Sequence, residues 1–379
     1  MTRVLIIGGY GNFGGYIARD LAADPNISLL IGGRSKAKAD AFVASLEAVN
    51  RAVGCAIDID GDLSATLDEL RPELVIHTTG PFQSQDHRVA WAAIDCGAHY
   101  LDLADARQFV ASIGELDAEA RRAGVVVIAG ASSVPCLTAA FIDHYRPRFA
   151  RLESVTYGIA AAQATNRGLA TAAAILSYVG KPFTILRGGA PKRVFGWQGL
   201  RGVRYPELGL RLFGYCDIPD LELFPARYPE LRDLEFAAGH EVKALHLGTW
   251  LLSWIARLGL VRSWAPYAGQ LLRLSFLFDH WESGKSGFHM FLDGVDADGR
   301  PARVTVFMVA RQVHGPNIPC IPATILARRI ATGQAPEPGA RPCLDLIHLD
   351  DLMLAIAPLD ITTTVEGPGI DDRWPGARP

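Results

Sequence analysis

Residues 4–22 have the sequence VLIIGGYGNFGGYIARDLA, which joins an apolar strand to an amphipathic helix through a glycine-rich turn. Gly9, Gly11 and Gly14 fit the spacing G-x-G-x-x-G, whose glycines permit a tight turn, a close backbone approach to a pyrophosphate, and packing of helix on strand. Gly8, Gly11 and Gly14 fit G-x-x-G-x-x-G equally well, so the turn alone does not separate the subfamilies of dinucleotide-binding proteins. The stretch predicts a pyrophosphate site at the helix N-terminus, with these binding residues: Gly9, Tyr10, Gly11, Asn12, Phe13 and Gly14.

The end of the second strand, expected at 27–31, bears on the choice between NAD and NADP. An NAD-binding chain usually carries an acid there, about twenty residues after the glycine turn, for the ribose hydroxyls. Here the strand runs into GGRSK without an acid, and Arg34 and Ser35 offer a cation and a hydroxyl to a 2′-phosphate. The pattern favours NADP, although arginine is common in a chain that has only six lysines.

Strands and helices alternate up to about residue 130, which predicts a doubly wound parallel sheet. The loops after the strands expected at 74–78, 99–103 and 125–129 would meet at one sheet edge, where ligands bind in such folds. We therefore expect an α/β chain of three parts. Residues 1–135 would form a Rossmann NADP-binding domain, and residues 136–318 an α+β substrate or dimerisation domain with a mostly antiparallel sheet. Residues 319–379 would form a helix that returns to the first domain, followed by a Pro- and Gly-rich tail with a possible edge strand at 359–366.

Composition excludes several classes of function. A formal net charge of -3 and the lack of a long basic run argue against nucleic acid as a partner. The six cysteines show neither C-x-x-C nor Cys/His ligand spacing, so we expect no metal and no disulfide framework. Because the first strand starts directly after Met1, no signal peptide is expected, and the cytoplasm is the simplest compartment.

Five motifs, in chain order, carry a resemblance to a known family: GGYGNFGG, GGRS, TTGPF, HYLDLAD and AGASSVPCLTAAF. With them the first third of the chain resembles the saccharopine dehydrogenase-like (saccharopine reductase-like) NADP-binding oxidoreductases. The resemblance implies that Gly80 and Pro81 flank the nicotinamide, and that Tyr100, Asp102 and the turn from Ser133 to Cys136 line the substrate side. It also implies a second domain after the sixth strand, followed by a return to the first. The cofactor-binding residues predicted beyond the glycine turn are Arg34, Ser35, Asp58, Thr79, Gly80, Pro81, Phe82 and Ser133.

The candidate catalytic residues are Tyr100 and Asp102. The pair Y-x-x-x-K of short-chain dehydrogenases occurs nowhere in the chain. We therefore expect direct hydride transfer from NADPH to a C=N, C=O or conjugated C=C bond, with a side chain or water delivering the proton. A carboxyl group with a raised pKa or a tyrosine can donate that proton. An equal alternative is that Asp102 caps the following helix or binds the cofactor ribose.

Three functions fit the sequence. The first is an NADP-dependent oxidoreductase acting on an amino-acid-derived imine or related carbonyl, which the family resemblance favours. The second is a trans-acting enoyl reductase-like enzyme for a lipophilic acyl substrate, and the third is a non-catalytic NADP sensor or scaffold. In each case we expect a small-molecule ligand and a homodimer.

A hydrophobic tract at 244–261 and 264–278 predicts a helical hairpin. His246 and Arg257 interrupt its first half, so it is too polar to span a bilayer, for which about 20 apolar residues are needed. We expect it to form core or a subunit contact; a lipophilic substrate tunnel and a membrane-surface contact remain open. No membrane partner is therefore expected, apart from surface association through 244–278.

Overall fold

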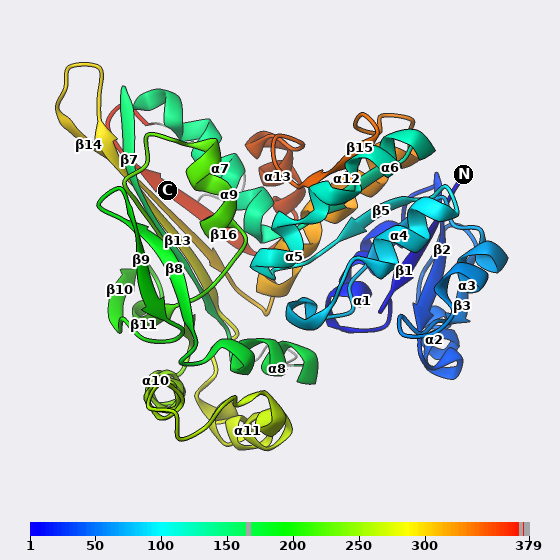
Figure 1. Ribbon diagram of the computed structural model, residues 1–379, viewed down its shortest axis with the longest axis horizontal. Coiled ribbons are helices and arrows are strands. Elements are labelled where there is room, and N and C mark those ends of the chain that lie inside the picture. Colours follow the sequence, from blue (N-terminus) through cyan, green and yellow to red (C-terminus); the bar gives the residue numbers. More distant parts are fainter. Residues whose placement is uncertain (164–167, 371–373, 375–379) are drawn as a thin grey trace. The chain divides into compact units, whose positions relative to one another are not determined.

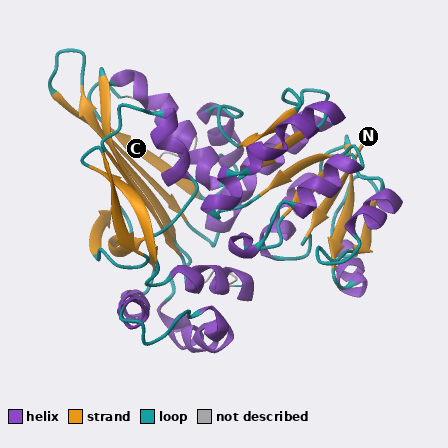
Figure 2. Cartoon of the chain, viewed as in Figure 1, coloured by secondary structure: helices purple, strands orange, loops and turns teal. Residues whose placement is uncertain are grey.

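The computed structural model describes residues 1–163, 168–370 and 374, and the chain divides into two compact units. The first unit comprises 1–140 and 317–348, and the second 141–316 and 349–379. The chain thus returns to the first unit after the second, as the family resemblance implies. Figures 1 and 2 show the elements of both units.

The first unit holds the Rossmann elements. Their bounds are β1 (Thr2–Ile7), α1 (Asn12–Ala22), β2 (Ile27–Gly33), α2 (Lys36–Val43), β3 (Ala52–Ala56), α3 (Leu63–Leu70), β4 (Leu74–His77), α4 (Arg88–Asp95), β5 (His99–Asp102), α5 (Arg107–Ala111), α6 (Asp117–Ala123), β6 (Val126–Ala129), α12 (Ile321–Ala331) and β15 (Gly339–Pro342). Helix α7 (Thr138–Tyr145) carries the chain into the second unit.

The sheet of the first unit is seven-stranded and parallel, in the order β15-β6-β5-β4-β1-β2-β3. The order reverses direction between β1 and β4, and in such sheets ligands bind outside the carboxyl ends of the strands at this point. Strand β1 is central, and Val4 to Ile7 are all buried, as expected for a parallel strand covered on both faces. The predicted fold class is confirmed for this part of the chain.

The second unit is built on a mixed sheet. Its elements are β7 (Arg151–Ala161), α8 (Leu169–Tyr178), β8 (Pro182–Arg187), β9 (Ala190–Phe195), β10 (Arg201–Tyr205), β11 (Gly209–Tyr215), α9 (Asp220–Arg227), β12 (Asp233–His240), α10 (Lys243–Arg257), α11 (Ala268–Ser275), β13 (Ser286–Val295), β14 (Pro301–Ala310), α13 (Leu349–Ile356) and β16 (Ile361–Glu366).

These strands form a nine-stranded sheet with the main order β10-β11-β12-β7-β13-β14-β16, to which β8 and β9 are added. Of the pairs between these strands, only that of β7 and β12 is parallel; the others are antiparallel. The mostly antiparallel second sheet is therefore confirmed, and so is the predicted edge strand at 359–366, since β16 pairs with β14.

Two local expectations were wrong. The sequence of residues 36–50 predicts a single helix, but the helix ends at Val43. The Asn50 amide donates to the carbonyls of Asp24, Pro25 and Ile27, which holds the following loop against the start of β2. The prolines and acids of residues 216–236 predict an irregular segment, but it contains α9 and the first part of β12. A hydrogen bond of 2.7 Å from the Tyr157 hydroxyl to Asp220 ties α9 to β7.

Candidate functional site

The glycine turn lies between β1 and α1, where the sequence predicted it. Gly8 has a φ of +83°, and its amide and that of Gly9 both donate to the Gly32 carbonyl of β2. A Cβ atom at Gly14 would lie 2.2 Å from the Gly8 carbonyl oxygen, so only glycine lets α1 pack this closely on the turn. The left-handed backbone of Gly8 shows that this residue, absent from the predicted binding set, is also required.

The turn presents two features that fit a pyrophosphate. Gly11 precedes α1, and no side chain of the described residues forms a capping hydrogen bond at this helix N-terminus, where an anion is stabilised. The hydroxyl of Thr79, next to Gly8, is buried and has no hydrogen-bond partner in the described chain. A buried hydroxyl normally has a partner, and a bound nucleotide would supply one. The residues present therefore fit a dinucleotide.

The residues after β2 are held by contacts with Tyr10 and with the start of α2. The Tyr10 hydroxyl accepts a hydrogen bond of 3.1 Å from the Ser35 amide, and its ring lies so close to Gly33 that a Cβ there would meet it at 2.4 Å. Ser35 caps α2 by accepting from the Lys38 amide. Arg34 is exposed and has no ion pair or hydrogen bond within the described residues. Its guanidinium is thus free to meet an anion at the end of β2.

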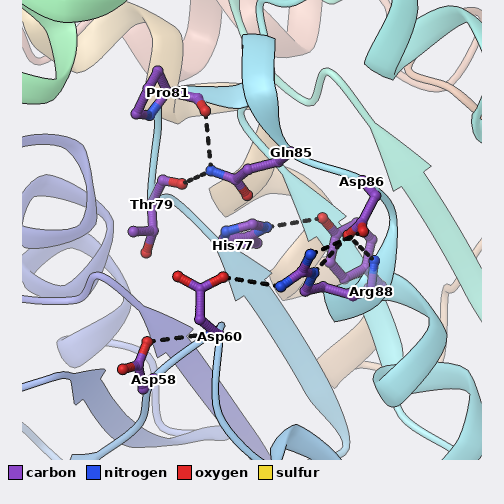
Figure 3. Close-up of polar contacts among 9 residues, drawn as sticks. Asp58, Asp60, His77, Thr79, Pro81, Gln85, Asp86 and Arg88 are labelled. Atoms are coloured by element: carbon purple, nitrogen blue, oxygen red, sulfur yellow. Dashed lines mark hydrogen bonds and ion pairs between the residues drawn. The ribbon is translucent and has the colours of Figure 1, made fainter. Parts of the chain in front are cut away.

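Asp58 lies beyond the end of β3 and is exposed (Figure 3). Its carboxylate accepts from the amide of Asp60, which closes a local turn. Asp60 in turn accepts a hydrogen bond of 2.9 Å from Arg88 at the start of α4. Asp58 is therefore at the sheet edge predicted for it, with part of its acceptor capacity taken by its own loop.

The loop after β4 is held by a residue that the sequence did not single out. The Gln85 side-chain amide donates to the carbonyls of Thr79 and Pro81, at 2.6 and 3.2 Å (Figure 3). Phe82 is buried, with its ring against His77 and Phe109 at centroid distances of 5.0 and 5.2 Å. The hydrogen bonds of Gln85 and the burial of Phe82 together hold the backbone of residues 79–82, the loop predicted to contact the nicotinamide.

Below this loop, His77, Tyr100 and Asp102 occupy neighbouring positions on β4 and β5 and are all fully buried. The Tyr100 hydroxyl is 3.1 Å from His77 Nδ1. Burial lowers the pKa of His77 to about 3, so this imidazole is neutral. It also raises the pKa of Tyr100 well above its ordinary value. His77 and Tyr100 thus form an uncharged hydrogen-bonded pair beside the loop.

Asp102 connects two loops of the sheet edge. One carboxylate oxygen accepts hydrogen bonds from the backbone amides of Ala104 and Gly130, at 2.9 and 2.8 Å. The other oxygen has no hydrogen-bond partner among the described residues. Burial raises its pKa to about 7, against the opposing effect of the two amides. Both candidate catalytic residues thus lie inside the first unit with no exposed surface, and their catalytic roles stay predictions.

Ser133 begins a helical turn that follows β6 and runs to Leu137. It is buried, and no side chain caps this turn. The structure therefore brings the ends of β1, β2, β3, β4 and β6 to one edge of the sheet, each with its predicted residues. His77 and Gln85 were missed because a buried histidine and a loop glutamine carry no spacing signal.

The comparisons with known proteins agree with this geometry. Residues 4–128 match the family model of the saccharopine dehydrogenase NADP binding domain. A search of curated protein sequences gives no match. The apo histidine-tagged saccharopine dehydrogenase (L-Glu forming) of Saccharomyces cerevisiae is similar in structure, with a TM-score of 0.69 and 15% identity over 97% of this chain and 100% of that chain.

A second solved structure, the amine dehydrogenase of Mycobacterium smegmatis, aligns with a TM-score of 0.48 and 12% identity, over 89% of this chain and 94% of that chain. At such identities the likeness concerns the fold. Residues 4–128 of the first unit, however, are also matched by the family model. Residues 4–128 are thus similar to the saccharopine dehydrogenase NADP binding domain, and the chain shares its fold with the yeast saccharopine dehydrogenase.

Proposed function

We propose that the protein is an NADP(H)-dependent oxidoreductase that transfers a hydride to or from an amino-acid-derived imine or a related carbonyl. The observation that carries this proposal is the uncapped N-terminus of α1 beside the unpartnered hydroxyl of Thr79. Backbone amides of the glycine turn would hold the pyrophosphate, and Thr79 would hydrogen-bond to the nucleotide.

Arg34 supports NADP rather than NAD. No acid follows β2, and an unpaired guanidinium at this point is suited to a 2′-phosphate, which it can bind through two parallel hydrogen bonds. Tyr10 would support this site indirectly, because its bond to the Ser35 amide fixes the backbone next to Arg34.

The substrate class is proposed from the relative and the site together. The similar yeast enzyme is a saccharopine dehydrogenase that forms L-Glu, which favours an amino-acid-derived substrate here. Bound NADPH would supply the hydride. Gln85 and Phe82 would position the loop at 79–81, and Asp102 with the Tyr100 and His77 pair would support it from below.

Arg34→Ala tests the cofactor assignment. We expect NADPH to bind about tenfold to a hundredfold more weakly to the variant, because a charge-assisted hydrogen bond to phosphate contributes about 1.5–3 kcal/mol. NADH binding should stay unchanged. Thermal unfolding with each nucleotide measures both, since a ligand that binds the folded state raises the melting temperature.

Arg51→Ala is the matched control, because Arg51 is an exposed arginine just before β3, at the opposite end of the strands. It should retain the full NADPH shift. No shift of the wild-type protein with either nucleotide would contradict the oxidoreductase proposal. Binding of NADPH without turnover of any imine, carbonyl or enoyl thioester would instead support the non-catalytic alternative.

A further inference from the structure

Helix α10 buries polar side chains and exposes apolar ones, the opposite of the usual amphipathic helix. The side chains that it buries are polar, namely His246, Thr249 and Ser253. Its apolar stripe, with spacings of four, three and four residues, is exposed, at fractions from 38% to 70%. A helix packed on its own domain turns its apolar stripe inward. The stripe on α10 consists of Leu247, Leu251, Trp254 and Leu258.

The exposed apolar surface continues over α11 and the turns beside it. We define the α10–α11 face as the exposed stripe of α10 together with Leu260, Tyr267, Leu274, Phe276, Leu277 and Trp281. Single exposed apolar side chains are normal on a protein surface, whereas ten of them within residues 247–281 indicate an interaction site.

The face is supported by ordered packing. The Trp264 indole donates a hydrogen bond of 3.0 Å to the Leu252 carbonyl, which joins the turn before α11 to α10. Leu252, Trp264 and Leu271 also pack on a buried cluster that includes Val179 and Trp197. In Figure 1, α10 and α11 lie near α8 at one end of the second unit's sheet. The apolar side chains are therefore presented outward by helices that are fixed from within.

The segment that carries this face has more cationic than anionic side chains. Residues 243–281 contain four cationic side chains, Lys243, Arg257, Arg262 and Arg273, and one carboxylate, Asp279. Asp279 faces the unit's own interior contacts, since it accepts from the Gln163 amide at 2.9 Å. The segment is thus cationic in a chain whose formal net charge is -3.

The exposed apolar side chains and the excess of positive charge together indicate which partner binds the α10–α11 face. Two copies of the same cationic face would repel each other across a symmetric contact. An anionic bilayer surface, in contrast, accepts leucine side chains below the headgroups, tryptophan and tyrosine at the interface, and arginine beside the phosphates. No helix of the described residues is long and apolar enough to cross a membrane. We propose that the α10–α11 face binds in the plane of an anionic lipid membrane.

Vesicle co-sedimentation of the full chain tests the proposal. We expect the wild type to bind vesicles of equal parts phosphatidylglycerol and phosphatidylcholine, and to bind phosphatidylcholine alone more weakly. The triple variant Leu247→Gln, Leu251→Gln, Leu258→Gln should bind the anionic vesicles at least about tenfold more weakly, because it removes three inserted apolar side chains. Arg262→Glu with Arg273→Glu should abolish the preference for anionic vesicles.

A second triple variant, Leu200→Gln, Leu210→Gln, Leu354→Gln, is the matched control, because these leucines are exposed elsewhere on the second unit. It should bind vesicles like the wild type. Equal loss in both triple variants would overturn the proposal, as would a wild type that stays in the supernatant with both vesicles. Sedimentation velocity tests the alternative that a second copy of the chain binds this face. If the wild type is a dimer that does not bind vesicles and the first triple variant is a monomer, the face is a dimer interface and the proposal is wrong.

Discussion

Gly14→Ala is expected to weaken NADPH binding by about a hundredfold. The new Cβ would lie 2.2 Å from the Gly8 carbonyl oxygen and 2.9 Å from the Gly9 Cα atom, and both are backbone atoms that cannot turn aside. Helix α1 must therefore move away from the turn that aims its amides at the pyrophosphate. Overpacking of this kind costs about 1–3 kcal/mol, and each 1.4 kcal/mol is a factor of about ten in affinity.

The neighbouring position supplies the control. At Gly15 the nearest atom to a new Cβ is the flexible Arg19 guanidinium, at 3.3 Å, so Gly15→Ala should bind NADPH normally. It should also be slightly more stable, because alanine favours a helix interior over glycine by about 1 kcal/mol. Fluorescence titration gives the affinity, and urea unfolding in parallel shows whether Gly14→Ala still folds. Normal NADPH affinity in a folded Gly14→Ala protein would contradict the assigned pyrophosphate site.

The first unit could be predicted from the sequence because its signals are local. A buried apolar strand, a glycine turn and a helix with regular apolar spacing occur within the first 22 residues, and parallel strands then repeat at regular intervals. The carboxyl ends of these strands share one edge, so residues such as Arg34 and Thr79 could be placed near the site from chain position alone.

The second unit was harder because its centre depends on contacts that are distant in sequence. Strand β12 follows a proline-containing helix, and it pairs in parallel with β7, about 80 residues earlier. The segment before it contains prolines and acids that look like a loop until Asp220 is seen bonded to Tyr157. No periodicity within residues 216–236 records that partner.

The hydrophobic tract shows a different limit. Its apolar spacing predicted the helices correctly, but periodicity gives a helix two faces without saying which is inward. In the structure the face with His246 and Ser253 packs inward, and the leucine stripe of α10 is exposed. That stripe is therefore not part of the core of this chain, and the subunit contact that the sequence also allowed stays a prediction.

Asp102 should lower the stability of the wild-type protein, relative to that of Asp102→Asn, as the pH rises from about 4 to about 8. The pKa of Asp102 is raised to about 7 in the folded state by burial, from an ordinary value near 4. Between these values the folded protein holds a proton that the unfolded chain releases, so the stabilising contribution is complete at low pH and is lost as the pH passes 7. The neutral His77 offers no positive charge to offset the carboxylate.

Three pKa units correspond to a loss of about 4 kcal/mol of stability. We therefore expect the free energy of unfolding of Asp102→Asn minus that of the wild type to be about 3 kcal/mol larger at pH 8 than at pH 5, which means that the variant gains relative stability as the pH rises. Urea unfolding at both pH values measures this difference. The side-chain amide introduced by Asp102→Asn would keep an oxygen for the backbone amides of Ala104 and Gly130, whereas Asp102→Ala leaves both backbone amides unpaired and should be destabilised at either pH. Parallel pH profiles of the wild type and Asp102→Asn would contradict the raised pKa.

The same variant separates the two roles open to Asp102. If its carboxyl group donates the reaction proton, kcat of the wild type must fall as the pH rises above 7, because only the protonated form is an acid, and Asp102→Asn must be inactive at every pH. If Asp102 positions the loops through its bonds to Ala104 and Gly130, Asp102→Asn keeps most of its kcat and loses the inflection near pH 7. The full burial of Asp102, with one oxygen held by both amides, favours the positioning role. We therefore expect kcat of Asp102→Asn to remain within about tenfold of the wild type, since less than about 1.4 kcal/mol of the barrier then depends on the charge.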